Sequence, residues 1–97
     1  MSKIIFLVTY TAKPGKRQDY LKALTNSGIL NKVREENGCL GYDFYESPEQ
    51  EDTLLLVEQW QNADCQKIHM EQPHMKESMV IKDQYIDQTT VVKTSPL

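Results

Sequence analysis

The chain has few cysteines and histidines, and neither type is spaced as metal ligands usually are. Cys39 and Cys65 form no C-x-x-C pair, and only two histidines accompany them, so the sequence predicts no zinc or iron set. The four glycines form no phosphate-cradling loop, which excludes flavin and nucleotide sites of that kind. We therefore expect a protein that binds no metal, flavin or haem.

Positive charge and long apolar runs are also scarce. Eleven Lys and Arg against fourteen Asp and Glu give a formal net charge of −3, and no basic stripe points to nucleic acid or anionic lipid. The apolar run from Ile4 to Val8 is too short for a signal-peptide core or a membrane span. We expect a single soluble domain over residues 1–97, located in the reducing cytoplasm.

Hydrophobic periodicity predicts the element order β-α-β-β-α-β. The expected strands cover residues 3–11, 40–46, 53–60 and 85–93. The first helical region follows Pro14 and ends at Asn37-Gly38, and its two apolar stripes are half a turn out of phase, so a break is expected at Ser27-Gly28. The second helical region is expected at residues 63–70 and 73–83, with Asn62 as its N-cap.

Two split β-α-β units predict a ferredoxin-like α+β sandwich with an antiparallel sheet. In that topology the strands at 3–11 and 53–60 form the central pair, and both carry unbroken apolar runs typical of strands buried on both faces. The helices can cover only one face of the sheet. We therefore expect a second copy of the chain to cover the other face, in a homodimer.

Several segments resemble the antibiotic biosynthesis monooxygenase domain family of dimeric α/β-barrel proteins. They are Lys13-Pro14-Gly15-Lys16, Glu35-Glu36-Asn37-Gly38-Cys39-Leu40-Gly41-Tyr42, Glu58-Gln59-Trp60, and His69 followed by Pro73-His74-Met75-Lys76. The last two are similar to strings of the quinol monooxygenase branch. The resemblance implies a pocket in each subunit, between sheet and helices, where a quinol or polyphenol is oxidised by dioxygen without metal or flavin.

The residues present also bear on the other functions found on this fold. The haem-degrading branch is set aside, because Val8-Thr9-Tyr10, His69 and Met79 stand where its Asn, Trp and His are expected. An isomerase or tautomerase of a small, possibly phosphorylated, carbonyl compound stays open, and so does a non-catalytic small-molecule-binding protein. A phosphorylated substrate would need cations at the pocket mouth, which Lys67, Lys76 and Lys82 could supply.

The two histidines are the candidate catalytic residues. His69 follows Cys65 by four positions and Ile68 by one, and we expect all three on one inward helix face. A buried neutral imidazole there can accept a phenolic proton. His74 directly follows Pro73 in the first turn of the next helix, and we expect a smaller catalytic contribution from it.

The candidate substrate-binding residues lie on the strands and the last helix. They are Trp60, Tyr42, Phe44, Glu58 and Met79. Trp60 offers a planar wall for an aromatic ring, and Glu58 shares its strand face, although an ion pair is the more ordinary role for such a carboxylate. Tyr42 and Phe44 share one face of their strand, with Asp43 and Tyr45 on the other, and parity alone does not say which face lines a pocket.

Overall fold

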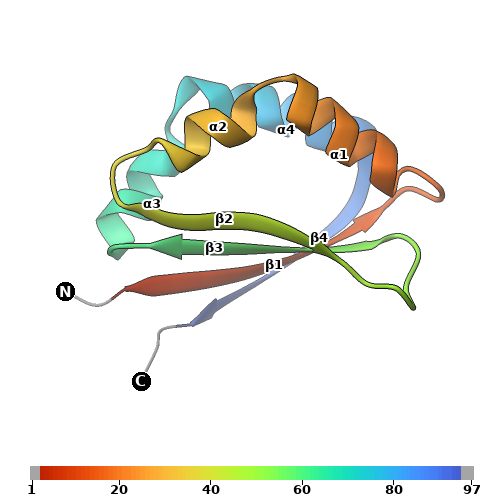
Figure 1. Ribbon diagram of the computed structural model, residues 1–97, viewed down its shortest axis with the longest axis horizontal. Coiled ribbons are helices and arrows are strands. Elements are labelled where there is room, and N and C mark those ends of the chain that lie inside the picture. Colours follow the sequence, from red (N-terminus) through yellow and green to blue (C-terminus); the bar gives the residue numbers. More distant parts are fainter. Residues whose placement is uncertain (1–2, 95–97) are drawn as a thin grey trace.

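The computed structural model describes residues 3–94, which form an antiparallel four-stranded sheet with all the helices on one side of it (Figure 1). The strands are β1 (Ile4–Ala12), β2 (Cys39–Glu46), β3 (Thr53–Trp60) and β4 (Ile86–Thr94). The helices are α1 (Arg17–Asn26), α2 (Ile29–Arg34), α3 (Ala63–Met70) and α4 (Pro73–Tyr85). The bounds of β3 and α3 are those predicted, and the other strands and α4 differ by one or two residues.

The strand order is β2-β3-β1-β4, so β1 and β3 are the central pair as predicted. The chain therefore has the ferredoxin-like α+β fold. In the β1–β3 register Phe6 lies opposite Glu58, and in the β1–β4 register Tyr10 lies opposite Thr89. Burial alternates along β3, where Leu54, Leu56, Glu58 and Trp60 are buried beneath the helices.

The predicted break in the first helical region is present. α1 ends at Asn26 and α2 begins at Ile29, and between them Gly28 has a φ of 79°, which glycine adopts without steric cost. The break turns both apolar stripes toward the sheet. Tyr20 and Leu24 of α1 are buried, as are Ile29 and Val33 of α2.

The face of the sheet opposite the helices is uncovered in the single chain (Figure 1), and apolar side chains lie at its centre. Leu7 and Val57 lie opposite each other on its central strands, and Leu55 is next to them. At the flanks Tyr45 and Val92 are 55% and 53% exposed. The homodimer that would cover this face stays a prediction.

None of the helices in residues 3–94 combines the length and apolar character needed to cross a membrane.

Candidate active site

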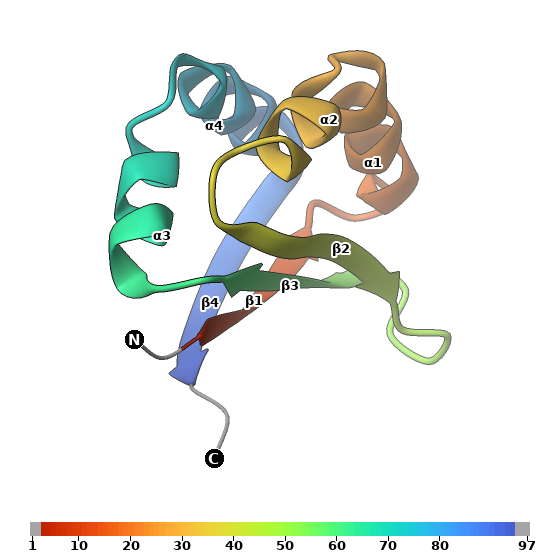
Figure 2. The same ribbon diagram turned by 60° about the vertical axis from the view of Figure 1, so that its left-hand side comes forward.

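A cavity of about 170 Å³ lies between the helix-covered face of the sheet and the helices α3 and α4. Side chains from strands β1, β2, β3 and β4 line one side of it, and side chains from the two helices line the other. Figure 2 shows both helices on the same side of the sheet. Most of its wall is apolar or aromatic and comes from Phe6, Val8, Tyr10, Tyr42, Met75 and Met79. Its polar groups come from Glu58, Gln66, His69, Ser78, Lys82 and Thr89. An engineered cavity of about 150 Å³ holds benzene, so this cavity has room for one aromatic ring.

His69 is the most deeply buried polar side chain of the cavity, with 0% of its surface exposed. Asn62 fixes the start of its helix, because its side chain accepts a hydrogen bond of 3.0 Å from the Cys65 backbone N–H. The imidazole packs against two aromatic rings, with centroid distances of 4.6 Å to Trp60 and 5.6 Å to Tyr42. These contacts hold the ring in one orientation.

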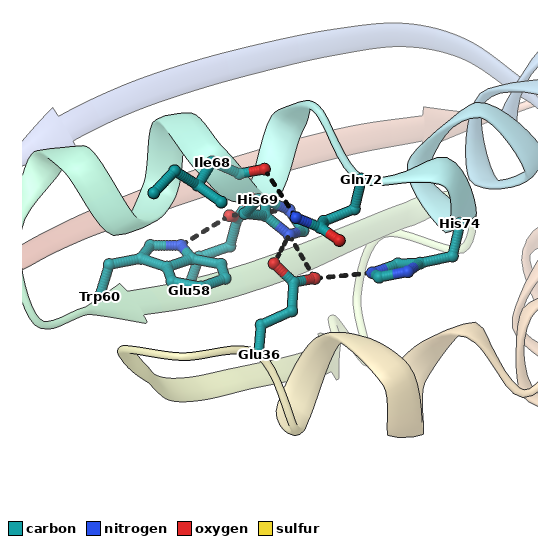
Figure 3. Close-up of polar contacts among 7 residues, drawn as sticks. All are labelled: Glu36, Glu58, Trp60, Ile68, His69, Gln72 and His74. Carbon is teal, nitrogen blue, oxygen red and sulfur yellow. Dashed lines mark hydrogen bonds and ion pairs between the residues drawn. The ribbon is translucent and has the colours of Figure 1, made fainter.

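One carboxylate contacts both histidines (Figure 3). Glu36 follows α2, and its side chain is only 11% exposed. Its Oε2 lies 2.9 Å from His69 Nδ1 and 2.7 Å from His74 Nε2. His74 reaches this carboxylate from the first turn of α4 and does not line the cavity.

These contacts determine where the histidine protons lie. An ionised carboxylate only accepts hydrogen bonds, so His69 must donate from Nδ1 and His74 must donate from Nε2. In neutral His69 the opposite nitrogen, Nε2, then carries a lone pair. This atom is buried and has no hydrogen-bond partner in the described structure, and its nearest acidic neighbour is Glu58 Oε1 at 3.9 Å. The wall of the cavity therefore includes an imidazole whose proton-accepting nitrogen is fixed by its contact with Glu36.

Glu58 is the second titratable group of the site. Its Oε1 accepts a hydrogen bond of 3.1 Å from Trp60 Nε1. Burial raises the pKa of Glu58 above its ordinary value of 4.5, while the Trp60 hydrogen bond and the nearby His69 act in the opposite direction. The site thus pairs an imidazole with a carboxyl group whose pKa is raised by burial.

The tyrosines of the cavity stay protonated to high pH. Burial, with the Glu58 charge adding to it, raises the pKa of Tyr10 to about 12 and the pKa of Tyr42 well above 10. Both phenols therefore act as hydrogen-bonding groups and as aromatic walls at neutral pH.

Gly38 holds the Glu36 loop against α3. Its φ is +83°, and a Cβ at this position would overlap Cys65 Sγ. Its carbonyl oxygen also accepts a hydrogen bond of 2.8 Å from the Gln61 backbone N–H at the end of β3. This close approach brings Glu36 within reach of His69.

Comparison with known protein families gives a match over most of the chain. The sequence model of the family described as "Antibiotic biosynthesis monooxygenase" matches residues 3–80, which contain every element of the site except β4 and the last turn of α4. The chain belongs to the antibiotic biosynthesis monooxygenase family.

Two curated relatives of this family member are identical to it at about a third or less of the aligned residues. An uncharacterized Synechocystis protein, sll1783, is 31% identical over 65 residues, which are 67% of this chain and 43% of the relative. The chain thus spans less than half of that relative's length. A Bacillus subtilis protein described as "Putative monooxygenase YcnE" is 27% identical over 73 residues, which are 75% of each chain.

Solved structures share the fold at low identity. The Pseudomonas aeruginosa protein PA3566 superposes with a TM-score of 0.87 at 20% identity, covering 100% of this chain and 96% of that one. The Mycobacterium tuberculosis protein Rv0793 superposes with a TM-score of 0.83 at 25% identity, covering 99% and 96%.

The structure places the predicted site residues of this family member in two groups. His69, Glu58, Tyr42 and Met79 line the cavity, so on β2 the face that carries Tyr42 is the inward one. Trp60 packs against His69, with ring centroids 4.6 Å apart, and does not line the cavity. Phe44 also lies outside it and packs against Tyr10 and Tyr20. We expect these last two aromatic residues to support the site rather than to contact a ligand.

The predicted position of Ile68 is wrong. Its side chain is 55% exposed, whereas His69 is fully buried and Cys65 packs against the core. Adjacent helical residues point about 100° apart, so the turn that directs His69 to the sheet directs Ile68 away from it. Ile68 instead borders a separate surface hollow beside Glu36.

Sequence reasoning did not select Glu36 as a site residue. It lies 33 positions before His69, and its local pattern indicates only the end of a helix. The one available signal was the short turn at Gly38. The residue pattern there predicts the end of a helix, but not that the turn lies close to α3. Within residues 3–94 no cluster of three His, Cys, Asp or Glu side chains is arranged to hold a metal ion, and the expectation of a cofactor-free protein stays a prediction.

Proposed function

We propose that this protein is a cofactor-independent monooxygenase that oxidises a quinol or a related polyphenol with dioxygen, with His69 as the proton acceptor. One observation carries the proposal. His69, a fully buried imidazole whose Nε2 has no hydrogen-bond partner within residues 3–94, is among the residues that line a mainly apolar cavity large enough for one aromatic ring. Membership of the antibiotic biosynthesis monooxygenase family supports the same reaction class.

The first step is the transfer of a proton from a substrate hydroxyl to His69 Nε2. This transfer makes His69 an imidazolium, and the Glu36 carboxylate at 2.9 Å from Nδ1 stabilises the new positive charge through a charge-assisted hydrogen bond. The substrate becomes an electron-rich phenolate. Because the surrounding wall is largely apolar, few water molecules compete for this anion.

The substrate itself supplies the electrons. The phenolate gives one electron to dioxygen, and the resulting aryloxyl radical and superoxide combine to form a C–O bond at a ring carbon. The peroxide then takes back the proton held by His69, its O–O bond breaks, and hydroxide leaves with the ring C–H proton as water. A quinol and dioxygen thus give a hydroxyquinone and water, and His69 returns to its starting form.

The positions of the lysines bear on the isomerase alternative. Lys82 lines the cavity, whereas Lys67 and Lys76 are exposed and do not. Among residues 3–94 the cavity surface therefore has one lysine, where a dianionic phosphate is usually met by several cations. This arrangement favours the quinol over a phosphorylated carbonyl compound. Room for a ring likewise favours a site for aromatic molecules over a closed, degenerate barrel.

We also propose that two copies pack through the uncovered sheet face. Leu7, Leu55 and Val57 form a continuous apolar centre on that face. Contiguous apolar surface of this kind on a soluble protein marks an interaction site. The pocket face and the dimer face are then opposite sides of one sheet.

A dioxygen-consumption screen tests the activity. Purified protein is mixed with a panel of hydroquinones and anthrone-like phenols, and the dioxygen uptake is recorded against a protein-free blank. We expect uptake above the blank for substrates with one free ring position beside a hydroxyl group. Absence of protein-dependent uptake across the whole panel would contradict the proposal.

A further inference from the structure

Lys82 is the one cation of the cavity wall within residues 3–94, and the mechanism proposed above does not use it. Its side chain is half-buried on α4, and Nζ lies 5.4 Å from the centre of the Tyr10 ring, which also lines the cavity. A cation held over an aromatic face gains about 0.5–1 kcal/mol at an exposed site, much less than a hydrogen-bonded anion would supply.

Within residues 3–94 the charge of Lys82 has no acidic partner. Among residues 3–94 no ion pair joins Lys82 to a carboxylate, although the chain pairs Lys16, Arg17 and Arg34 with acids elsewhere. Two hydroxyl groups share the wall with it. Ser78 lies one helical turn earlier on the same face of α4, and Thr89 lies opposite Tyr10 in the β1–β4 register.

Lys82 and the acid–base pair occupy opposite ends of the cavity. Glu58 lies opposite Phe6 on β1, whereas Lys82 lies over Tyr10, four residues further along that strand. At about 3.3 Å per residue the two points on β1 are roughly 13 Å apart. Between them the lining is apolar, with Val8 in the centre of the floor and Met79 above it.

The Lys82 end is also close to solvent. Lys82 is itself half-buried, and Thr89, which lies opposite Tyr10 on β4, is exposed. A charged group of the substrate can therefore contact Lys82 and keep part of its hydration shell. At the fully buried His69 end the same group would lose its hydration shell, at a cost in free energy.

We propose that Lys82 binds an acidic substituent of the substrate, so that the cavity accepts a phenol or quinol carrying one negatively charged group at the end remote from the reacting hydroxyl. This proposal rests on the proposed function only for the end of the substrate that reacts at His69. One ammonium group with two neighbouring hydroxyls matches a singly charged carboxylate, and the cavity volume limits the body of the molecule to one ring.

Binding is tested without turnover, by calorimetry in oxygen-free buffer at neutral pH. The probes are gentisate, a hydroquinone ring with one carboxylate, and gentisamide, its neutral amide of nearly equal size. We expect the wild-type protein to bind gentisate roughly tenfold more tightly than gentisamide, the lower end of the range for a hydrogen bond to a charged group. The preference should shrink as salt is added.

Variants then assign the preference to Lys82. Lys82→Gln should abolish it, and Lys82→Arg should keep most of it. Lys76→Gln removes an equal charge from the exposed side of the same helix and should leave the preference unchanged. Equal affinity of the two probes for the wild-type protein, a preference that survives in Lys82→Gln, or no binding of gentisate at millimolar concentration would overturn the proposal. Because no dioxygen is present, these outcomes do not depend on whether the protein is a monooxygenase.

Discussion

Replacement of Glu36 with Gln tests the reasoning about the histidine protons. In the wild-type protein one carboxylate accepts hydrogen bonds from His69 Nδ1 and His74 Nε2, and this fixes Nε2 of His69 as the free acceptor. The glutamine amide is similar in shape but neutral, and its NH₂ group can only donate. We expect Glu36→Gln to lose part of the base function without loss of fold, because His69 can then adopt either tautomer.

The size of the effect follows from the lost charge. A hydrogen bond to a charged group contributes about 1.5–3 kcal/mol, and the Glu36 bond is needed most when His69 becomes an imidazolium. Since 1.36 kcal/mol corresponds to a factor of ten in rate, kcat should fall roughly 10- to 150-fold. KM should change little, because the Glu36 carboxylate faces His69 and His74 and does not line the cavity.

Long-range ¹⁵N–¹H correlation spectra of the histidine rings provide a readout independent of turnover. Neutral His69 of the wild-type protein should carry its proton on Nδ1, and Glu36→Gln should show a mixture of tautomers. Glu35→Gln is the matched control, because Glu35 is adjacent and exposed and makes no contact with either ring. A wild-type spectrum with the proton of neutral His69 on Nε2 would refute the assignment of the base.

Three further variants test the surrounding structure. Burial raises the pKa of Glu58 above 4.5, so the stability that this group contributes is present below pH 4.5 and is lost as the pH rises through its pKa in the folded protein. In urea titrations, Glu58→Gln should therefore gain stability relative to the wild type as the pH rises. A difference in stability that does not change with pH would contradict this. Gly38→Ala combines a left-handed φ with overlap at Cys65 and should cost about 2–5 kcal/mol of unfolding free energy, whereas a loss under 1 kcal/mol would show that the loop relaxes easily. Val57→Lys should give a monomer by sedimentation velocity, with Val80→Lys on the exposed side of α4 as the control that stays dimeric; a monomeric wild type would remove the dimer proposal altogether.

Much of the fold could be predicted from local patterns. The unbroken apolar runs identified β1 and β3 as the central pair, and the phase offset between the Tyr20–Leu24 and Ile29–Val33 stripes located the break at Gly28. Asn62 was identified as a helix cap because its side chain type and the following turn match that role. These features depend on residues close together in the sequence, which is why periodicity reveals them.

The site depends on contacts that periodicity does not encode. His69 could be assigned to a buried helix face, but its contact with Glu36 joins residues 33 positions apart through the turn at Gly38. The same limit applies to Trp60 and Phe44. The pattern assigned each of them to a strand face but could not show that both lie outside the cavity. Parity identifies a face, whereas a cavity is defined by what the helices leave unfilled.

The central claim is that His69 Nε2 removes a proton from the substrate, and the most direct measurement is dioxygen uptake by His69→Gln on the hydroquinone that gives the highest wild-type rate. Glutamine preserves much of the packing against Trp60 and Tyr42 but is no base. The account predicts a loss of roughly 10²–10⁴-fold in turnover per folded molecule, the usual range for a general base, with nearly unchanged circular dichroism. Full dioxygen uptake by folded His69→Gln would contradict it.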